Sequence, residues 1–198
     1  MTTTGILLFD DVEELDFAGP WEVLTVARRE GDSVVTVAEK PGLIRCGQGL
    51  RVMPDHTFAD CPPLDVIVVP GGAGPFTEVD NPVLMSWLAE VSANAEWVTS
   101  VCTGTLLHWA TGVAKGRTVA THSMFVEQLR AMGDITVVDD QRWVADGNLV
   151  TAAGVSAGID MALWLVGQIY DEDHGRYVQD AIEYEPEPPF SRRTPVEV

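Results

Sequence analysis

Residues 64–72 read LDVIVVPGG, a run that is apolar apart from Asp65 and ends in a proline and two glycines. The run is short and rich in β-branched residues, which favours a buried strand over a helix. Residues 4–9 (TGILLF), 33–38 (SVVTVA) and 96–101 (EWVTSV) have the same character. Helical patterns separate these stretches, so strands and helices alternate along the chain. Such alternation predicts a mostly parallel sheet covered by helices on both faces.

Turn and cap residues divide the rest of the chain. Asn81 before Pro82 indicates the start of a helix, because Asn caps helices and proline fits their first turn. Residues 47–49 (GQG) and 146–147 (DG) indicate two hairpins, the second with a two-residue turn. We expect hairpins within 43–53 and 142–152, a strand over 118–121, and helices over 20–30, 82–94, 103–111, 123–132 (capped by Ser123), 156–170 and 174–183.

The length and composition fit one α/β domain. A chain of 198 residues that is 46% apolar can bury a substantial core. We expect the domain to span residues 1–184 and a proline-rich tail to follow over 185–198, because the prolines there cannot continue a helix. Apart from the hairpins, the sheet is expected to be parallel.

The charge of the chain is strongly negative. Twelve Lys and Arg against thirty Asp and Glu give a net charge of −18, which repels phosphate backbones and anionic membranes. Nucleic acid and membrane partners are therefore not expected. Only Lys40 and Lys115 are lysines. This composition has two interpretations that stay open: adaptation to a high-salt cytoplasm, and an ordinary acidic protein from a genome that favours arginine codons.

Cysteine usage predicts a reducing compartment, and hydropathy predicts a soluble protein. Cys46, Cys61 and Cys102 are an odd number without a C-x-x-C pair, so neither a disulfide framework nor a zinc site is expected. No apolar run reaches the roughly 18 residues that span a bilayer. The N-terminus lacks the basic start of a signal peptide. We expect a soluble, cytoplasmic protein.

Cys102 follows a predicted strand and precedes a predicted helix. Residues 97–105 read WVTSVCTGT, with small residues two positions before and after the cysteine, at Ser100 and Gly104. This is the spacing of a nucleophile elbow, a sharp turn that exposes a reactive side chain. The dipole of the following helix favours a thiolate. The alternative is a buried structural cysteine, but the two small residues favour a reactive thiol.

Two other segments are expected at the same sheet edge. Gly71 and Gly72 end a strand, and their N–H groups can bind an anion or simply permit a turn; beside Cys102 we favour an oxyanion-binding role. Asp16 lies between two apolar residues and is either a helix cap or a desolvated acid/base group. The local sequence favours the cap. Glu13 and Glu14 are expected to be solvated.

Four stretches together resemble the ThiJ/PfpI superfamily: residues 14–24 (ELDFAGPWEVL), 60–72 (DCPPLDVIVVPGG), 98–104 (VTSVCTG) and 153–160 (AGVSAGID). The resemblance covers residues 4–182 and implies a flavodoxin-like three-layer sandwich. The chain is most similar to the isocyanide hydratase branch, which has Asp in the first motif and Thr after the cysteine. Asp16, Cys102 and Thr103 match both features. Proteases of the superfamily have His after the cysteine, and here the position is Thr103, so peptide hydrolysis is not expected.

The resemblance implies hydration of an isocyanide to an N-substituted formamide. Cys102 would attack the isocyanide carbon, Asp16 would act as acid and base, and Thr103 would position the thiol. Gly71, Gly72, Gly154 and Val155 are expected to bind the substrate or its developing charge, with His122 and Ser100 supporting the site. No metal or cofactor is implied, the partner is a small-molecule substrate, and relatives suggest a homodimer. The chain ends soon after the domain, so a fused DNA-binding module is not expected.

Two other functions remain open on the same thiol. One is a different enzyme, an amidase or a glyoxalase-like activity on small carbonyl compounds. The other is a non-catalytic, redox-responsive protein in which Cys102 is oxidised to a sulfinate.

Overall fold

A computed structural model describes residues 1–188 of the chain. A seven-stranded sheet forms its centre, and two short two-stranded sheets accompany it. The strands are β1 (Thr3–Leu7), β2 (Ser33–Ala38), β3 (Ile44–Arg45), β4 (Arg51–Val52), β5 (His56–Thr57), β6 (Val66–Val69), β7 (Trp97–Val101), β8 (Thr118–Ala120), β9 (Thr136–Val138), β10 (Trp143–Asp146) and β11 (Leu149–Ala152).

The order of the large sheet is β10-β11-β7-β6-β1-β2-β5. All neighbours pair in parallel except the edge hairpin β10–β11, which is antiparallel. The carboxyl ends of β1, β6 and β7 therefore meet at one edge. Ligands of open parallel sheets bind at this edge.

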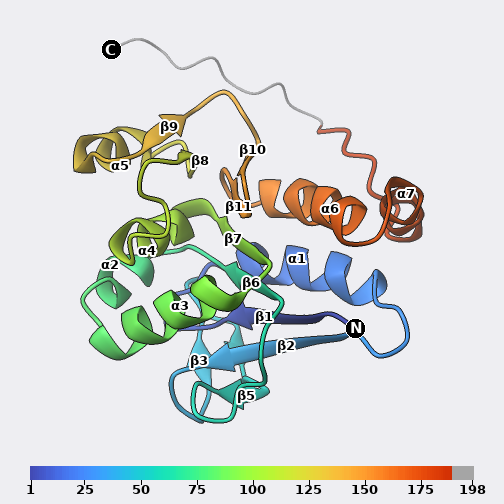
Figure 1. The fold of residues 1–198 in the computed structure, drawn as a ribbon, viewed down its shortest axis with the longest axis horizontal. Helices are drawn as coiled ribbons and strands as arrows, with labels where there is room; N and C mark the ends of the chain where they lie inside the picture. Colours follow the sequence, from blue (N-terminus) through green and yellow to red (C-terminus); the bar gives the residue numbers. More distant parts are fainter. Residues whose placement is uncertain (189–198) are drawn as a thin grey trace.

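Helices cover both faces of the sheet. In Figure 1, α1, α6 and α7 gather on one side of the strands, and α2, α3 and α4 on the other. The helices are α1 (Glu14–Val26), α2 (Pro75–Glu78), α3 (Pro82–Asn94), α4 (Thr105–Ala110), α5 (Val126–Met132), α6 (Ala157–Ile169) and α7 (Glu172–Ala181), and a 3₁₀ turn precedes α4 (Cys102–Gly104). This is the flavodoxin-like, mostly parallel arrangement predicted from the sequence.

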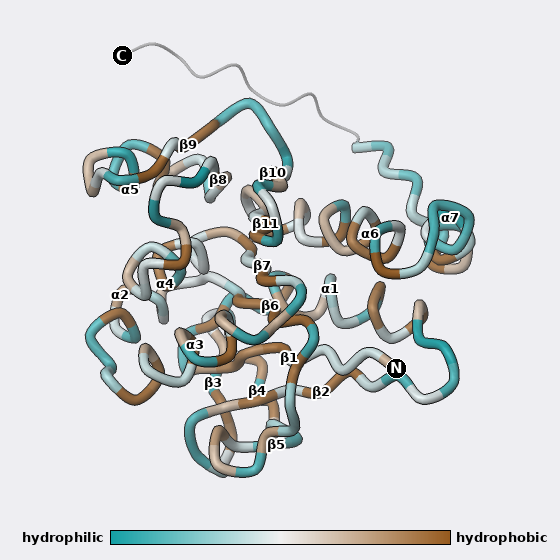
Figure 2. The backbone as a smooth tube through the Cα atoms, viewed as in Figure 1, coloured by the Kyte–Doolittle hydropathy of each residue, from teal (hydrophilic) through white to brown (hydrophobic). Residues whose placement is uncertain are grey.

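The core lies between the central strands and the two helix layers. All four residues of β6 are fully buried, and the brown strands in Figure 2 contrast with the teal surface of α7. Strands buried on both faces read as continuous apolar runs, which is why residues 64–72 were informative.

Two small units flank the sheet. β3 and β4 form the hairpin expected within residues 43–53. β8 and β9 form a separate parallel pair. Side-chain bonds join β8 to the edge hairpin: Thr151 Oγ1 accepts the N–H of Ala120 at 2.7 Å, and Asp146 accepts the N–H of Thr118 at 2.7 Å.

Several local predictions were wrong. α1 begins at Glu14 rather than at Pro20, which lies inside the helix. Ser123 does not cap α5, which begins three residues later after Phe125. The second hairpin turns at residues 147–148, because Asp146 still pairs with Leu149. The part of the predicted tail beyond residue 188 lies outside the described residues.

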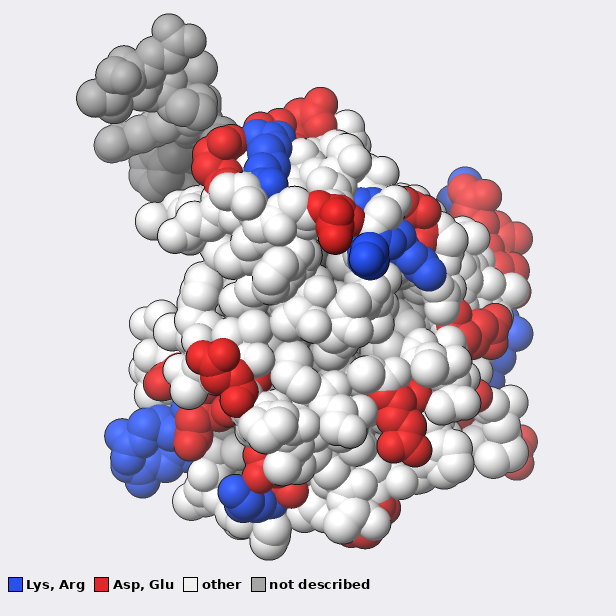
Figure 3. Space-filling model, turned by 60° about the vertical axis from the view of Figure 1, so that its left-hand side comes forward, with Lys and Arg blue, Asp and Glu red and all other residues white. Residues whose placement is uncertain are grey.

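Charged side chains are dispersed on the face shown in Figure 3. Acidic groups and a smaller number of basic ones surround a broad uncharged surface. No helix within residues 1–188 is long and apolar enough to cross a membrane.

Candidate active site

Cys102 occupies a sharp turn between β7 and α4. Its backbone has φ 60°, a left-handed conformation that is uncommon for a residue with a side chain. Gly104 allows the turn to pack against β6, since a Cβ at this position would lie 2.2 Å from the carbonyl oxygen of Val69. Ser100 is fully buried and its hydroxyl bonds that of Thr105 at 2.9 Å. The small residues at these two positions therefore permit the elbow predicted from their spacing.

Neighbouring strands hold the backbone of the elbow. The N–H of Cys102 donates to Ala153 O at 2.9 Å, and its carbonyl oxygen accepts the hydroxyl of Thr121 at 2.8 Å. The thiol-bearing residue is thus tied to the chain after β11 on one side and to the end of β8 on the other.

Asp16 is fully buried in the first turns of α1. Its Oδ2 accepts the N–H of Gly71 at 2.9 Å, and its Oδ1 has no hydrogen-bond partner of normal geometry among the described residues. Asp16 is not a helix cap, because Glu13 precedes the helix and the cap makes no side-chain bond. The preference for a cap, taken from the local sequence, was wrong: the carboxyl points into the protein.

Burial raises the pKa of Asp16 to about 7. The N–H of Gly71 opposes this rise, the charge of Glu13 adds to it, and a bond with the Cys102 thiol lowers the pKa slightly. A carboxyl group with this pKa exchanges protons near neutral pH, as an acid/base catalyst must.

Burial and, after it, the charge of Asp16 raise the pKa of the Cys102 thiol to about 11. The backbone N–H groups of Thr103 and Val155, followed by the Thr103 hydroxyl, oppose the rise. The thiol therefore holds its proton at neutral pH, contrary to the thiolate expected from the helix dipole. Because the thiol and Asp16 interact, the carboxylate can take this proton when sulfur attacks.

The two glycines at the end of β6 fix the acid and the elbow. Gly71 donates its N–H to Asp16, and Gly72 donates its N–H to Thr103 Oγ1 at 2.9 Å. A Cβ on Gly71 would lie 2.6 Å from the Thr103 backbone nitrogen. Both amides are engaged by protein atoms, so the oxyanion-binding role expected from the sequence is not met in this structure. In this structure the two amides hold the side chains of Asp16 and Thr103.

The segment that leads into α1 is held on two sides. Val12 forms an isolated antiparallel bridge with Gly72, and the N–H of Gly47 donates to Val12 O at 2.8 Å. Glu14 accepts the N–H of Gln48 at 2.9 Å. Glu14 thus anchors the β3–β4 hairpin beside Asp16, a role that the expectation of a solvated side chain missed.

A cavity of about 370 Å³ adjoins the elbow. Its lining includes Thr121, His122, Gly154 and Val155. The His122 ring covers Gly154, where a Cβ would lie 2.7 Å from the ring. Val155 has φ 36°, a strained conformation for a β-branched residue. Gly154 and Val155, both predicted to bind the substrate, therefore line the cavity that adjoins the elbow.

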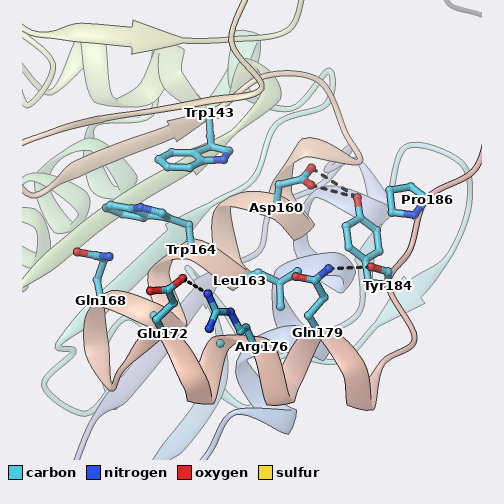
Figure 4. A pocket seen from close by; sticks show the side chains of 12 residues that line it. Trp143, Asp160, Leu163, Trp164, Gln168, Glu172, Arg176, Gln179, Tyr184 and Pro186 are labelled. Carbon is cyan, nitrogen blue, oxygen red and sulfur yellow. Dashed lines mark hydrogen bonds and ion pairs between the residues drawn. The ribbon is translucent and has the colours of Figure 1, made fainter.

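A larger cavity of about 620 Å³ lies between α6, α7 and β10. Figure 4 shows Trp143 and Trp164 on one side of it and the Glu172–Arg176 pair on another. No cysteine lines this cavity, so it does not supply the elbow chemistry. Within residues 1–188, no three His, Cys, Asp or Glu side chains lie close enough to hold a metal ion.

Comparison with known proteins agrees with this geometry. Residues 3–168 match the family model described as "DJ-1/PfpI family". The chain belongs to the DJ-1/PfpI family. An isonitrile hydratase of Pseudomonas putida is 40% identical over 191 residues, which cover 96% of this chain and 82% of the relative. A Parkinson disease protein 7 homolog of Danio rerio is 28% identical over 170 residues, 83% of this chain and 87% of the relative.

A solved DJ-1/PfpI structure has the same fold. The crystal structure of a THiJ/PfpI family protein from Pseudomonas syringae has a TM-score of 0.89 at 30% sequence identity, and the match covers 96% of this chain and 77% of that one.

Sequence reasoning missed several residues around the site. Glu13 influences the pKa of Asp16, and its N–H donates to Gly71 O at 2.9 Å. Thr121 bonds the Cys102 carbonyl, and Asp139 and Asp140 line the adjoining cavity. The position of Thr121 at the end of a predicted strand was the available signal, since side chains there converge on the ligand edge.

Proposed function

We propose that the protein is an isocyanide (isonitrile) hydratase, which adds water to R–N≡C and releases an N-substituted formamide. The observation that carries the proposal is the buried pair of Asp16 and Cys102, in which the carboxyl has a pKa of about 7. The relative named isonitrile hydratase supports it at 40% identity.

The first step forms a bond between sulfur and the isocyanide carbon. Asp16 as carboxylate takes the thiol proton while Cys102 Sγ attacks. The carbon is left with an electron pair, and Asp16 returns the proton to it. The product is a thioimidate, R–N=CH–S–Cys102. A soft sulfur nucleophile suits this carbon electrophile, and the same carboxyl serves as base and acid.

The second step hydrolyses the thioimidate. Asp16 takes a proton from water as the water oxygen bonds the carbon, and then donates that proton to nitrogen. The tetrahedral adduct collapses when the C–S bond breaks and the new hydroxyl loses its proton to Asp16. The carboxyl then reprotonates the sulfur. One water is consumed and one formamide leaves.

The backbone near Cys102 stabilises charge on sulfur. The N–H groups of Thr103 and Val155 both lower the pKa of the thiol, so they favour the transient thiolate during attack and collapse. Thr103 also bonds Gly72, which keeps the loop after β6 beside the elbow.

The test is formamide formation from a simple alkyl isocyanide. We expect turnover by the wild type and by Cys61→Ala, and none by Cys102→Ala. Turnover of methylglyoxal or of an amide with none of an isocyanide would instead support the alternative enzymes. A folded protein without turnover whose Cys102 is oxidised by peroxide to a sulfinate would support redox sensing.

Three expectations from the sequence accompany the proposal. We propose that the protein is cytoplasmic and forms a homodimer. Analytical ultracentrifugation tests the homodimer through the mass of the assembly. The acidic composition keeps its two interpretations, adaptation to high salt and an ordinary acidic protein, and thermal unfolding at different salt concentrations distinguishes them. A melting temperature that stays constant from low to molar salt would contradict adaptation to high salt.

A further inference from the structure

The cavity beside the elbow is placed to receive the part of a substrate that does not react. It is lined by the residues that touch the Cys102 backbone: Thr121 bonds the Cys102 carbonyl, Ala153 accepts its N–H, and Val155 lies against its sulfur. Cys102 is not itself a lining residue, but Val155, whose N–H faces its sulfur, is, so the N-substituent of a substrate bonded to Sγ would extend past Val155 into this volume of about 370 Å³. The lining away from the elbow then meets that substituent.

The outer wall of the cavity has an excess of negative charge. Arg142 lines it, but its Nε donates to Asp160 Oδ2 at 2.8 Å and the pair is neutral. Asp139 is paired with Arg130 at 3.1 Å. Asp140 also lines the cavity, and within residues 1–188 it makes no ion pair or side-chain hydrogen bond. One uncompensated carboxylate therefore remains on this wall.

Two sets of donors beside the cavity, the Arg142 guanidinium and the first N–H groups of α6, are already engaged. Arg142 also donates to Ser156 Oγ at 3.3 Å, so its guanidinium is bonded to two protein side chains. The helix α6 begins beside the cavity, and the N–H groups of Ala157 and Gly158 donate to the carbonyls of Gly154 and Val155 at 3.1 and 3.2 Å. A carboxylate substituent would therefore face negative charge with no free donor among these groups.

We propose that this cavity selects isocyanides with a compact cationic N-substituent, and that Asp140 is the residue that determines this preference. The inference rests on the proposed hydratase function. Asp140 is exposed at the cavity mouth, so its contact with a cation is partly solvated and of the strength of a surface ion pair. His122 Nδ1 accepts the N–H of Met124 at 3.2 Å, which leaves Nε2 to carry the N–H of the ring.

The direct test compares three isocyanides of equal length that end in a trimethylammonium, a hydroxyl and a carboxylate group. We expect kcat/KM to fall in that order. Asp140→Asn should lower the ratio of trimethylammonium to hydroxyl substrate by about two- to fivefold, the range for a partly solvated ion pair. Asp173→Asn is the matched control, because Asp173 is a 94% exposed carboxylate on α7. It removes the same charge and should leave the ratio unchanged.

A second measurement needs no turnover. In a Cys46→Ala/Cys61→Ala background, Cys102 is labelled with methanethiosulfonates that bear either a trimethylammonium or a sulfonate group. The cationic reagent should react faster, and Asp140→Asn should reduce this preference where Asp173→Asn does not. Equal effects of the two variants would overturn the role of Asp140 and would show that the net negative charge of the whole protein causes the preference. If no isocyanide is turned over but the labelling preference depends on Asp140, the hydratase proposal fails and the selectivity of the cavity stands.

Discussion

The hydroxyl of Thr103 bonds both backbone groups of Gly72: it donates to the carbonyl oxygen at 2.8 Å and accepts the N–H at 2.9 Å. Because Gly71 donates to Asp16 at 2.9 Å, two adjacent glycines link the residue after the thiol to the acid. The hydroxyl oxygen of Thr103 donates one hydrogen bond and accepts another. A single ring nitrogen of a His at this position could not do both.

Replacing Thr103 by Val should remove both bonds while keeping the shape of the side chain. We expect a loss of about 1–3 kcal/mol in the free energy of unfolding, because the half-buried backbone groups of Gly72 lose their partner. Hydratase turnover should fall about tenfold or more, since Gly71 no longer holds Asp16. Denaturant unfolding and kcat provide the measurements. Thr103→Ser retains the hydroxyl and should stay close to wild type; equal losses in both variants would contradict this role.

Asp16→Asn should abolish hydration and make the thiol more reactive. The substitution removes the charge that raises the pKa of Cys102, so more thiolate exists at pH 8. We expect faster alkylation of Cys102 by iodoacetamide together with a loss of formamide production. Slower alkylation would show that Asp16 activates the resting thiol rather than taking its proton during attack.

The stability of the same variant relative to wild type should rise with pH. The folded pKa of Asp16 is about 7, against an ordinary value of 3.8 for an aspartate, so the folded wild type retains a proton that the unfolded chain has released. Wild type therefore loses stability between pH 4 and 7, by up to about 4 kcal/mol, and Asn does not. Unfolding at pH 4, 6 and 8 measures the difference between the two proteins. A difference that does not change with pH would contradict the buried, protonated carboxyl.

Gly104→Ala should destabilise the elbow, and Gly167→Ala should stabilise α6. A Cβ at Gly104 meets Val69 O at 2.2 Å, whereas at Gly167 the nearest atom is Glu172 Cα at 3.8 Å. We expect a loss of about 1–3 kcal/mol for the first and a gain of about 0.5–1 kcal/mol for the second. Thermal unfolding compares the two variants, and similar effects would show that the close approach of Gly104 relaxes without cost.

His108 should make the protein sensitive to acid. It is fully buried, and burial lowers the pKa of its imidazole to about 4, with a partly compensating bond to Thr99 O at 3.1 Å. The unfolded chain takes up a proton near pH 6.5, so the stability present above this pH is lost as the pH falls toward 4, by up to about 3 kcal/mol. The advantage of wild type over His108→Gln should shrink across this range. A constant difference in unfolding free energy would contradict it.

The parallel core and the elbow were predictable because local pattern and tertiary structure agree there. Strand β2 was predicted with its exact bounds, and Asn81 caps α3 by accepting N–H groups of Val83 and Leu84 as expected. Ser100 and Gly104 indicated the turn at Cys102 through steric size alone. None of these inferences needed contacts between distant segments.

The predictions that failed depend on such contacts. α1 includes Pro20 because the helix packs closely on α6: a Cβ on Gly158 would lie 3.3 Å from the Pro20 ring. Burial between helices outweighs the cost of the proline. The cap prediction for Asp16 was wrong because it also depended on a distant contact. The local sequence does not reveal the N–H of Gly71, 55 residues further on. The engaged amides of Gly71 and Gly72 were equally invisible.

The separate pairing of β8 and β9 has an evolutionary consequence. Thr121 and His122 directly follow β8, yet within residues 1–188 β8 and β9 pair only with each other and not in the ladder of the seven-stranded sheet. Insertions or deletions within residues 123–135, between the two strands, therefore leave the register of β6 and β7 unchanged, and they keep Thr121, which bonds the Cys102 carbonyl. Related proteins can therefore differ in the surface formed between β8 and β9 and still retain the arrangement of Asp16 and Cys102.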